Sequence, residues 1–123
     1  MNTFEVSVSG WFAAAHQLRM PDGGLERLHG HNWRATITYA GPQLDEMEVL
    51  VDFTRLKPAL DAILAALHDR HLNELPAFAT RNPSAENVAR HIAERLAAEF
   101  STPARLACVE VEETPGCVAR FRP

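Results

Sequence analysis

The stretch His29-Gly30-His31-Asn32-Trp33-Arg34-Ala35-Thr36-Ile37-Thr38-Tyr39 decides the fold, because its side chains alternate between two faces. A period of two is typical of a strand with one buried face. The residues expected on that face are His31, Trp33, Ala35, Ile37 and Tyr39, and Gly41-Pro42 ends the strand. If the strand already includes His29, both histidines project from this face, and Gly30 lets the backbone and a ligand approach closely.

A second alternating segment precedes this strand. From Thr3 to Phe12, the apolar side chains Phe4, Val6 and Val8 share one side. Turn residues from Met20 to Gly24 separate the two segments. We therefore expect an antiparallel pair in which His16, at the end of the first strand, lies beside the start of the second.

Helical spacing follows in the middle of the chain. Apolar residues recur at Phe53, Leu56, Leu60, Ile63, Leu64 and Leu67, which predicts an amphipathic helix capped by Asp52 or Thr54. Asn82-Pro83 is the expected start of a second helix that carries Val88, Ile92, Leu96 and Phe100. Strands over 106–113 and 117–122, joined at Thr114-Pro115-Gly116, complete an α+β order of ββααββ.

Length and charge limit the class of protein. The chain has 123 residues and a formal net charge of -4, so we expect one domain over 1–123 and no general field for nucleic acid or an anionic membrane. No stretch approaches the roughly 18 apolar residues of a membrane span, and no signal peptide is apparent. We therefore expect a cytoplasmic protein with reduced cysteines, and oligomerisation is a natural way to complete an active site in so small a domain.

His16, His29 and His31 form a candidate metal site. Three neutral imidazoles with an open fourth position are typical of catalytic zinc, although copper or iron could bind the same nitrogens. The alternative is a chance surface pair at His29 and His31, with His16 a hydrogen-bonded histidine at the end of a strand. The spacing alone leaves both interpretations open.

Motifs along nearly the whole chain then favour the metal. They are Phe12-Ala13-Ala14-Ala15-His16, Leu28-His29-Gly30-His31-Asn32, Val51-Asp52-Phe53, His71-Leu72-Asn73, Asn82-Pro83-Ser84 with Glu86-Asn87, Glu113-Thr114 and Gly116-Cys117. In this order the chain resembles the 6-pyruvoyl-tetrahydropterin synthase and 6-carboxytetrahydropterin synthase family.

The resemblance implies a fold, a metal and an assembly. The tunnelling fold of this family has a ββααββ subunit with a four-stranded antiparallel sheet and two helices on one face. Its subunits assemble into barrels, commonly as homohexamers with active sites between subunits. The resemblance also implies that His16, His29 and His31 bind Zn²⁺ and that the substrate is a reduced pterin such as dihydroneopterin triphosphate.

The proton-transfer residues depart from the family pattern. Most members have a cysteine base shortly before His-Gly-His, but Leu25 occupies the corresponding position here. Glu26 lies on the same loop, and the resemblance to a glutamate-bearing branch makes it the expected base; its alternative role is a solvated loop charge. The usual Asp-His pair is inverted to His68-Asp69, and His71 follows in the same turn. These three are candidates for a second proton relay, or only partners of a helix terminus.

Substrate recognition is expected at the other end of the chain. Val109, Val111 and Glu113 share a strand face, and the paired donors of a pterin ring match a carboxylate. Resemblance to the family makes Glu113 the pterin anchor. Ser84 and Glu86 border the same pocket in the family, or only decorate the start of a helix. Arg27, Arg70 and Lys57 are candidate phosphate ligands or solvated charges.

The resulting hypothesis is a zinc-dependent lyase that acts on the side chain of 7,8-dihydroneopterin triphosphate. Its glutamate favours retro-aldol cleavage toward 6-hydroxymethyl-7,8-dihydropterin. The alternatives are a triphosphate-eliminating 6-pyruvoyl- or 6-carboxytetrahydropterin synthase and a non-catalytic pterin-binding relative. Folate, biopterin, deazapurine and specialised metabolism all remain open as pathways.

Overall fold

The computed structural model describes residues 2–123. The fold begins with a long hairpin of β1 (Phe4–His16) and β2 (His29–Gly41). It continues through α1 (Phe53–Ala65), the two-residue β3 (Arg70–His71), the short 3-10 helices η1 (Leu72–Glu74) and η2 (Pro76–Phe78), and α2 (Ala85–Glu99). A second hairpin of β4 (Arg105–Thr114) and β5 (Cys117–Phe121) ends the chain.

The sheet has five strands in the order β3-β1-β2-β4-β5. The four long strands are antiparallel, as expected, but β3 adds to the free edge of β1 in a parallel orientation. The prediction of a four-stranded antiparallel sheet is therefore wrong in this detail. Two residues are too few to produce an alternating pattern, so β3 left no signal in the sequence.

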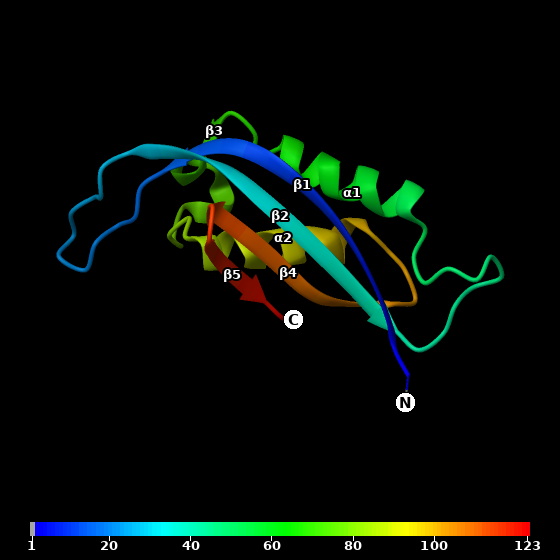
Figure 1. The fold of residues 1–123 in the computed structure, drawn as a ribbon. Helices are drawn as coiled ribbons and strands as arrows, with labels where there is room; N and C mark the ends of the chain where they lie inside the picture. Colours follow the sequence, from blue (N-terminus) through cyan, green and yellow to red (C-terminus); the bar gives the residue numbers. More distant parts are fainter. Residues whose placement is uncertain (1) are drawn as a thin grey trace.

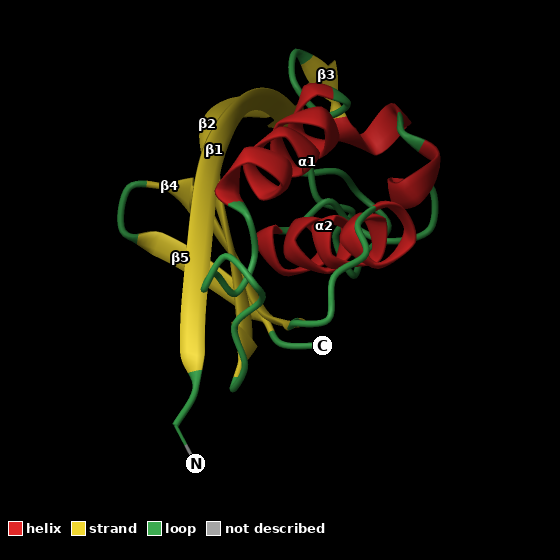
Figure 2. Ribbon diagram, turned by 90° about the vertical axis from the view of Figure 1, so that its right-hand side faces the viewer, coloured by secondary structure: helices red, strands yellow, loops and turns green. Residues whose placement is uncertain are grey.

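Both helices cover one face of the sheet, which leaves the other face without helices (Figures 1 and 2). The core between these layers is apolar, and its largest fully buried side chains include Trp33, Phe12, Phe78, Ile37, Leu56, Leu60, Ile92 and Leu96. This arrangement confirms the α+β class and the placement of two helices on one face. Among the predicted helical apolar positions, Phe53 is exposed, because it is the first residue of α1.

The two helix starts differ in how well the sequence predicted them. The Asp52 carboxylate accepts from the Thr54 backbone N–H at 2.8 Å, so the expected cap of α1 is confirmed. The expectation of Asn82-Pro83 as the start of α2 is wrong. Ser84 is the cap, since its Oγ accepts from the Asn87 N–H at 3.2 Å, and the Asn82 side chain is bound elsewhere.

Within residues 2–123, no helix has the length and apolar character needed to cross a membrane.

Candidate metal centre and active site

The β1–β2 register places the three histidines together. His16 pairs directly with His29, and Ala14 pairs with His31. Side chains two residues apart on a strand share a face, so all three imidazoles project from the helix-covered face at the end of the hairpin. Their candidate ligand nitrogens lie within 4.8 Å of one another.

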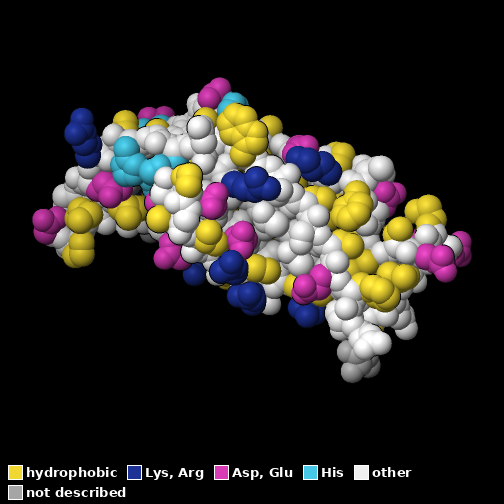
Figure 3. Space-filling model, viewed as in Figure 1, with side chains coloured by type: hydrophobic (Ala, Val, Ile, Leu, Met, Phe, Trp, Pro, Cys, Tyr) yellow, Lys and Arg dark blue, Asp and Glu magenta, His cyan; other side chains and the backbone are white. Residues whose placement is uncertain are grey.

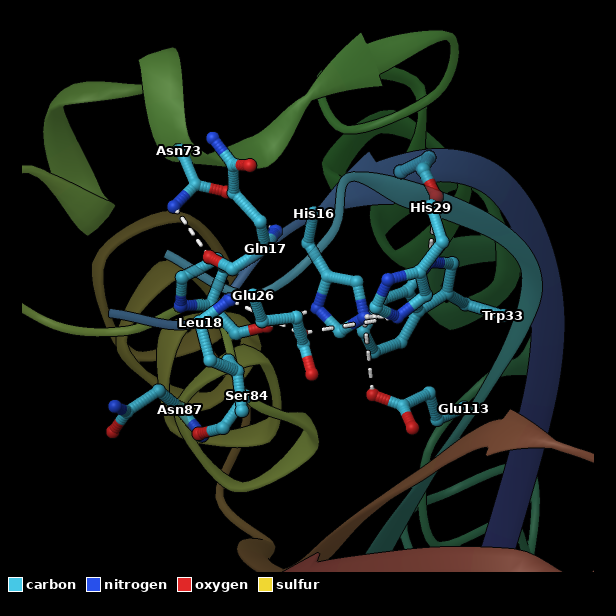
Figure 4. Close-up of polar contacts among 12 residues, drawn as sticks. His16, Gln17, Leu18, Glu26, His29, Trp33, Asn73, Ser84, Asn87 and Glu113 are labelled. Carbon is cyan, nitrogen blue, oxygen red and sulfur yellow. Dashed lines mark hydrogen bonds and ion pairs between the residues drawn. The ribbon is translucent and has the colours of Figure 1, made fainter. Parts of the chain in front are cut away.

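Two backbone carbonyls determine which nitrogen of each ring carries the proton. His16 Nδ1 donates to the Pro83 carbonyl at 2.7 Å, and His29 Nδ1 donates to the Arg27 carbonyl at 2.7 Å. A carbonyl oxygen only accepts, so each neutral ring has its lone pair on Nε2. The two Nε2 atoms face each other at 3.0 Å (Figure 4). Two lone pairs this close repel unless a cation binds between them.

His31 completes this donor set. Its Nε2 is buried and has no hydrogen-bond partner among the described residues. Burial, the largest cause, lowers the pKa of His31, and the nearby His16 and His29 lower it further, whereas Glu113 and Glu26 raise it. A lowered pKa favours the neutral imidazole that binds metals. The three residues therefore fit a metal ion through their Nε2 atoms, with second-sphere carbonyls that orient two of the rings.

Trp33 packs against two of the three histidines, His16 and His31. Its side chain is fully buried, and its ring centroid lies 4.8 Å from that of His16 and 5.6 Å from that of His31. The indole Nε1 donates to the Ala14 carbonyl at 3.1 Å. An indole fixed in this way limits the rotation of both neighbouring imidazoles.

Glu26 reaches the same site from the hairpin loop. Its Oε1 lies 3.9 Å from His29 Nε2 and accepts from the Leu18 backbone N–H at 3.1 Å (Figure 4). The Glu26 N–H in turn donates to the Leu18 carbonyl at 2.9 Å. The carboxylate is therefore held beside the histidines, as a base would have to be. Its catalytic role stays a prediction.

Glu113 approaches the histidines from β4. Its Oε1 lies 3.4 Å from His16 Nε2, and 29% of its side chain is exposed. It also lines a hollow of about 500 Å³ together with Leu18, Ser84, Glu86, Gly116 and Cys117. The sequence predicted Ser84, Glu86 and Glu113 at one pocket, and the structure brings all three together. Their contact with a substrate stays a prediction.

The surface around this site carries charges of both signs together with apolar side chains (Figure 3). Histidine atoms reach the surface near the hairpin end of the molecule, beside Asp or Glu and hydrophobic side chains (Figure 3).

Among the cations considered for phosphate binding, Lys57 pairs with Asp61 on α1 at 2.6 Å. Its ammonium is therefore already engaged in an ion pair.

The inverted His68-Asp69 pair lies elsewhere. The His68 Nδ1 accepts from the Ala13 N–H at 3.0 Å, and the ring meets Trp11 edge-on at 6.0 Å. Trp11 is 65% exposed on the helix-free face. Although inverted in order, the pair is in contact, since His68 Nε2 and Asp69 Oδ2 are 3.4 Å apart.

His71 lies on the helix-free face as well. It pairs with Ala15, and both residues line a hollow of about 490 Å³ together with Gly30, His31 and Asp69. The structure therefore brings Glu26 and Glu113 to the histidine triad. Within one chain it leaves His68, Asp69 and His71 on the opposite face of the sheet. Their catalytic role also stays a prediction.

The family model described as 6-pyruvoyl tetrahydropterin synthase matches residues 5–123. The chain belongs to this family. The resemblance expected from the motifs is thus confirmed. A solved structure of 6-pyruvoyl tetrahydropterin synthase from Caenorhabditis elegans has the same fold, with a TM-score of 0.87 at 25% identity, and the match covers 100% of this chain and 97% of that one.

Relatives in the synthase family carry different names. A 6-carboxy-5,6,7,8-tetrahydropterin synthase from Synechocystis is 35% identical, with 89% of this chain and 86% of the relative covered. A dihydroneopterin monophosphate aldolase from Pyrococcus furiosus is 32% identical, with 69% of this chain and 68% of the relative covered. Family membership thus establishes a pterin synthase-like protein and leaves the reaction to be proposed.

In this member of the synthase family, four groups that shape the site were not among the predicted site residues. Trp33 could have been found, because it shares a strand face with His31. Asn73 and Asn82, the second of which was expected at the start of a helix, bind the segment after His16 through their side chains. The Pro83 carbonyl binds His16 itself. A backbone carbonyl has no signature in a sequence, so only the structure could reveal that contact.

Proposed function

We propose that this protein is a zinc-dependent lyase that cleaves the side chain of a reduced pterin of the dihydroneopterin triphosphate type. The observation that carries this proposal is the position of Glu26. Its carboxylate lies 3.9 Å from His29 Nε2, but Glu26 does not belong to the candidate ligand set of three histidines. A base beside a metal is what the removal of a hydroxyl proton requires.

Zinc is the proposed ion for the donor set of His16, His29 and His31. Three imidazoles that present Nε2 suit Zn²⁺ and leave one position for a substrate oxygen. When bound, Zn²⁺ supplies Lewis acidity to the hydroxyl oxygens of the substrate. The bound-ion content of purified protein tests this assignment independently of the reaction.

Glu113 is the proposed anchor of the pterin ring. Two parallel N–H donors on the ring match a carboxylate in the manner of a bidentate pair. The hollow of about 500 Å³ beside Glu113 is large enough for a bicyclic ring. Ser84 and Glu86 border this hollow from the start of α2. The ring would thus lie near α2, with the side chain extending toward Glu26.

The proposed reaction is a retro-aldol cleavage. Glu26 accepts the proton of the second side-chain hydroxyl, whose carbon becomes an aldehyde as the carbon-carbon bond to the ring-side carbon breaks. The released electron pair is taken up by the ring imine, and the ring-side carbon then gains a proton to give 6-hydroxymethyl-7,8-dihydropterin. The leaving fragment is a phosphorylated glycolaldehyde, so atoms and charge balance. The Pyrococcus relative named as an aldolase supports this choice.

The second candidate is a triphosphate-eliminating synthase. The Synechocystis relative, a 6-carboxytetrahydropterin synthase at 35% identity, favours it. That reaction starts with proton removal from carbon, which is a heavier demand on a carboxylate than proton removal from a hydroxyl. For this reason the aldolase reaction remains the proposal.

The proposed assembly is a homohexamer with active sites between subunits. The supporting observation is that His68 and Asp69 lie on the opposite face of the sheet from the histidine triad of the same chain. In an oligomer these two side chains would serve the triad of a neighbouring subunit. Their contact at 3.4 Å would then form part of a proton relay.

Product analysis tests the proposed reaction. Zinc-loaded protein is incubated with 7,8-dihydroneopterin triphosphate, and the products are identified by mass. We expect 6-hydroxymethyl-7,8-dihydropterin and a phosphorylated glycolaldehyde, and no product from Glu26→Ala at unchanged zinc content. A 6-pyruvoyl or 6-carboxy product without the hydroxymethyl compound would reject the aldolase in favour of the second candidate.

A further inference from the structure

The segment Gln17–Arg19, which follows β1, is bound along one edge by two asparagine side chains. Asn73 Oδ1 accepts from the Gln17 N–H at 3.0 Å, and Asn73 Nδ2 donates to the Gln17 carbonyl at 2.7 Å (Figure 4). Asn82 does the same at Arg19, with distances of 2.7 Å and 3.1 Å. Each carboxamide therefore takes the place of one residue of a neighbouring strand.

Glu26 binds the opposite edge of the same segment. The Leu18 N–H donates to Glu26 Oε1, and the Leu18 carbonyl accepts from the Glu26 N–H. In an extended chain, successive residues direct their N–H and carbonyl groups to opposite edges. Two asparagines that fix residues 17 and 19 on one edge thus direct the polar groups of Leu18 to the other, where Glu26 lies.

We propose that Asn73 and Asn82 are positioning residues for Glu26: by holding Gln17–Arg19 extended, they fix the Leu18 N–H that orients the Glu26 carboxylate beside His29. Only Oε1 is held by this bond, so the second carboxylate oxygen stays available for a substrate proton. This inference rests on the proposed function of Glu26 as the base, but its geometric part concerns only the Leu18–Glu26 contact.

The two asparagines are themselves well anchored. Asn73 belongs to η1, and Asn82 lies in the connection before α2, where its carbonyl accepts from Asn87 Nδ2 at 2.9 Å. The Arg19 guanidinium also donates to the carbonyls of Phe78 and Arg81, at 2.7 Å and 3.1 Å. Two connections that are distant in sequence from the hairpin loop therefore determine the orientation of Glu26.

Asparagine is well suited to this position because it supplies a donor and an acceptor on one short, planar group. An aspartate retains the acceptor, but it places a carboxylate oxygen against a backbone carbonyl. Asn73→Asp and Asn82→Asp thus remove one bond each with little change in volume. Asn73→Ala and Asn82→Ala remove both bonds and test whether the effect grows.

Amide hydrogen exchange of Leu18 gives a measurement that does not depend on activity. We expect each asparagine variant to accelerate this exchange at least about fivefold. Zinc content should stay unchanged, because the two asparagine side chains bind Gln17 and Arg19 and not His16, His29 or His31. Turnover should fall about 10- to 100-fold at nearly constant KM, as expected for a misplaced catalytic group. Asn2→Ala, in an exposed residue before β1, is the control and should leave Leu18 exchange unchanged.

Three results separate the possibilities. Unchanged Leu18 exchange in all four variants would overturn the proposal. Faster exchange with undiminished turnover would also overturn it, provided that Glu26→Gln is impaired. Undiminished turnover of Glu26→Gln would instead contradict the proposed function of Glu26, and Leu18 exchange would still decide whether the asparagines fix its side chain. If an alanine variant does not fold, the two aspartate variants supply the answer.

Discussion

The two clusters of histidine and acidic side chains in this molecule are built in different ways. The triad of His16, His29 and His31 stands on two paired strands, and its geometry follows from the register of one hairpin. The His68-Asp69 pair follows α1 at the edge of the sheet, and the Asp69 backbone has a positive φ of 58°. A site built on strand register is determined by local pairing, whereas a site built on a connection depends on what packs around it.

The largest effect that this comparison predicts concerns the triad. His31→Ala removes one of three converging nitrogens, so we expect zinc affinity to fall by more than about 100-fold and turnover to be lost. His68→Ala, at the other cluster, is the matched control and should retain full zinc content. Metal analysis of both purified variants tests this prediction. An equal loss of zinc in the two variants would show that the clusters are not independent.

Substitution of Glu26 should lower turnover without changing metal binding. Glu26→Ala removes the proposed base and leaves all three ligand nitrogens, so we expect turnover to fall about 10²- to 10⁴-fold at constant zinc content. Glu46→Ala, an exposed acidic residue in the loop after β2, serves as the control. A parallel loss of zinc in Glu26→Ala would mean that the carboxylate acts on the metal site itself.

Mixed oligomers test whether the two clusters meet across subunits. Co-expressed Glu26→Ala and His68→Ala chains are each expected to be impaired alone. Random pairing leaves roughly a quarter of the sites with both native groups if each site draws on two subunits. Activity of the mixture above the sum of the two separate variants is the expected result, and simple additivity would place both groups in one chain or outside the reaction.

The smallest effect that we expect concerns His91 on α2, which lies in a third environment, and it is a change of stability with pH. His91 packs against Phe78, with Glu94, Arg95 and Arg81 as its charged neighbours, and burial, the largest cause, lowers its pKa. The unfolded chain therefore takes up a proton at about pH 6.5 before the folded chain does. Stability should fall as the pH drops below this value, by at most about 1.4 kcal/mol for each pH unit.

Urea unfolding of the zinc-loaded protein at pH 7.5 and 5.5 measures this effect. His91→Gln should lose less stability between the two pH values than the wild type does. Zinc loading matters for the comparison, because a metal bound to the folded state adds to its stability and its content must be the same in both proteins. An equal loss in both proteins would assign the acid sensitivity to other groups.

The sequence predicted the parts of the site that depend on strand periodicity. The alternation through Trp33, Ala35 and Ile37 located the β2 face, and the spacing of His29 and His31 placed two candidate ligands on it. The same logic put Glu113 on the inner face of β4. Contacts that depend on chain connections were not predictable: β3 is too short to show a pattern, and the Asn82 side chain binds Arg19 rather than capping α2. The metal ion, the reaction and the hexamer stay predictions.

The bonds around His16 also have a consequence for folding. His16 and His29 are 13 residues apart and belong to a single hairpin, so bringing them together costs little loop entropy. The contacts of residues 16, 17 and 19 with Pro83, Asn73 and Asn82 span 67, 56 and 63 residues, and they form only when both later connections have docked. The contact between His16 and His29 is therefore local in sequence, whereas the orientation of Glu26 depends on contacts between distant parts of the chain. The proposed metal-binding pair can therefore form before the fold is complete, whereas the proposed orientation of Glu26 cannot.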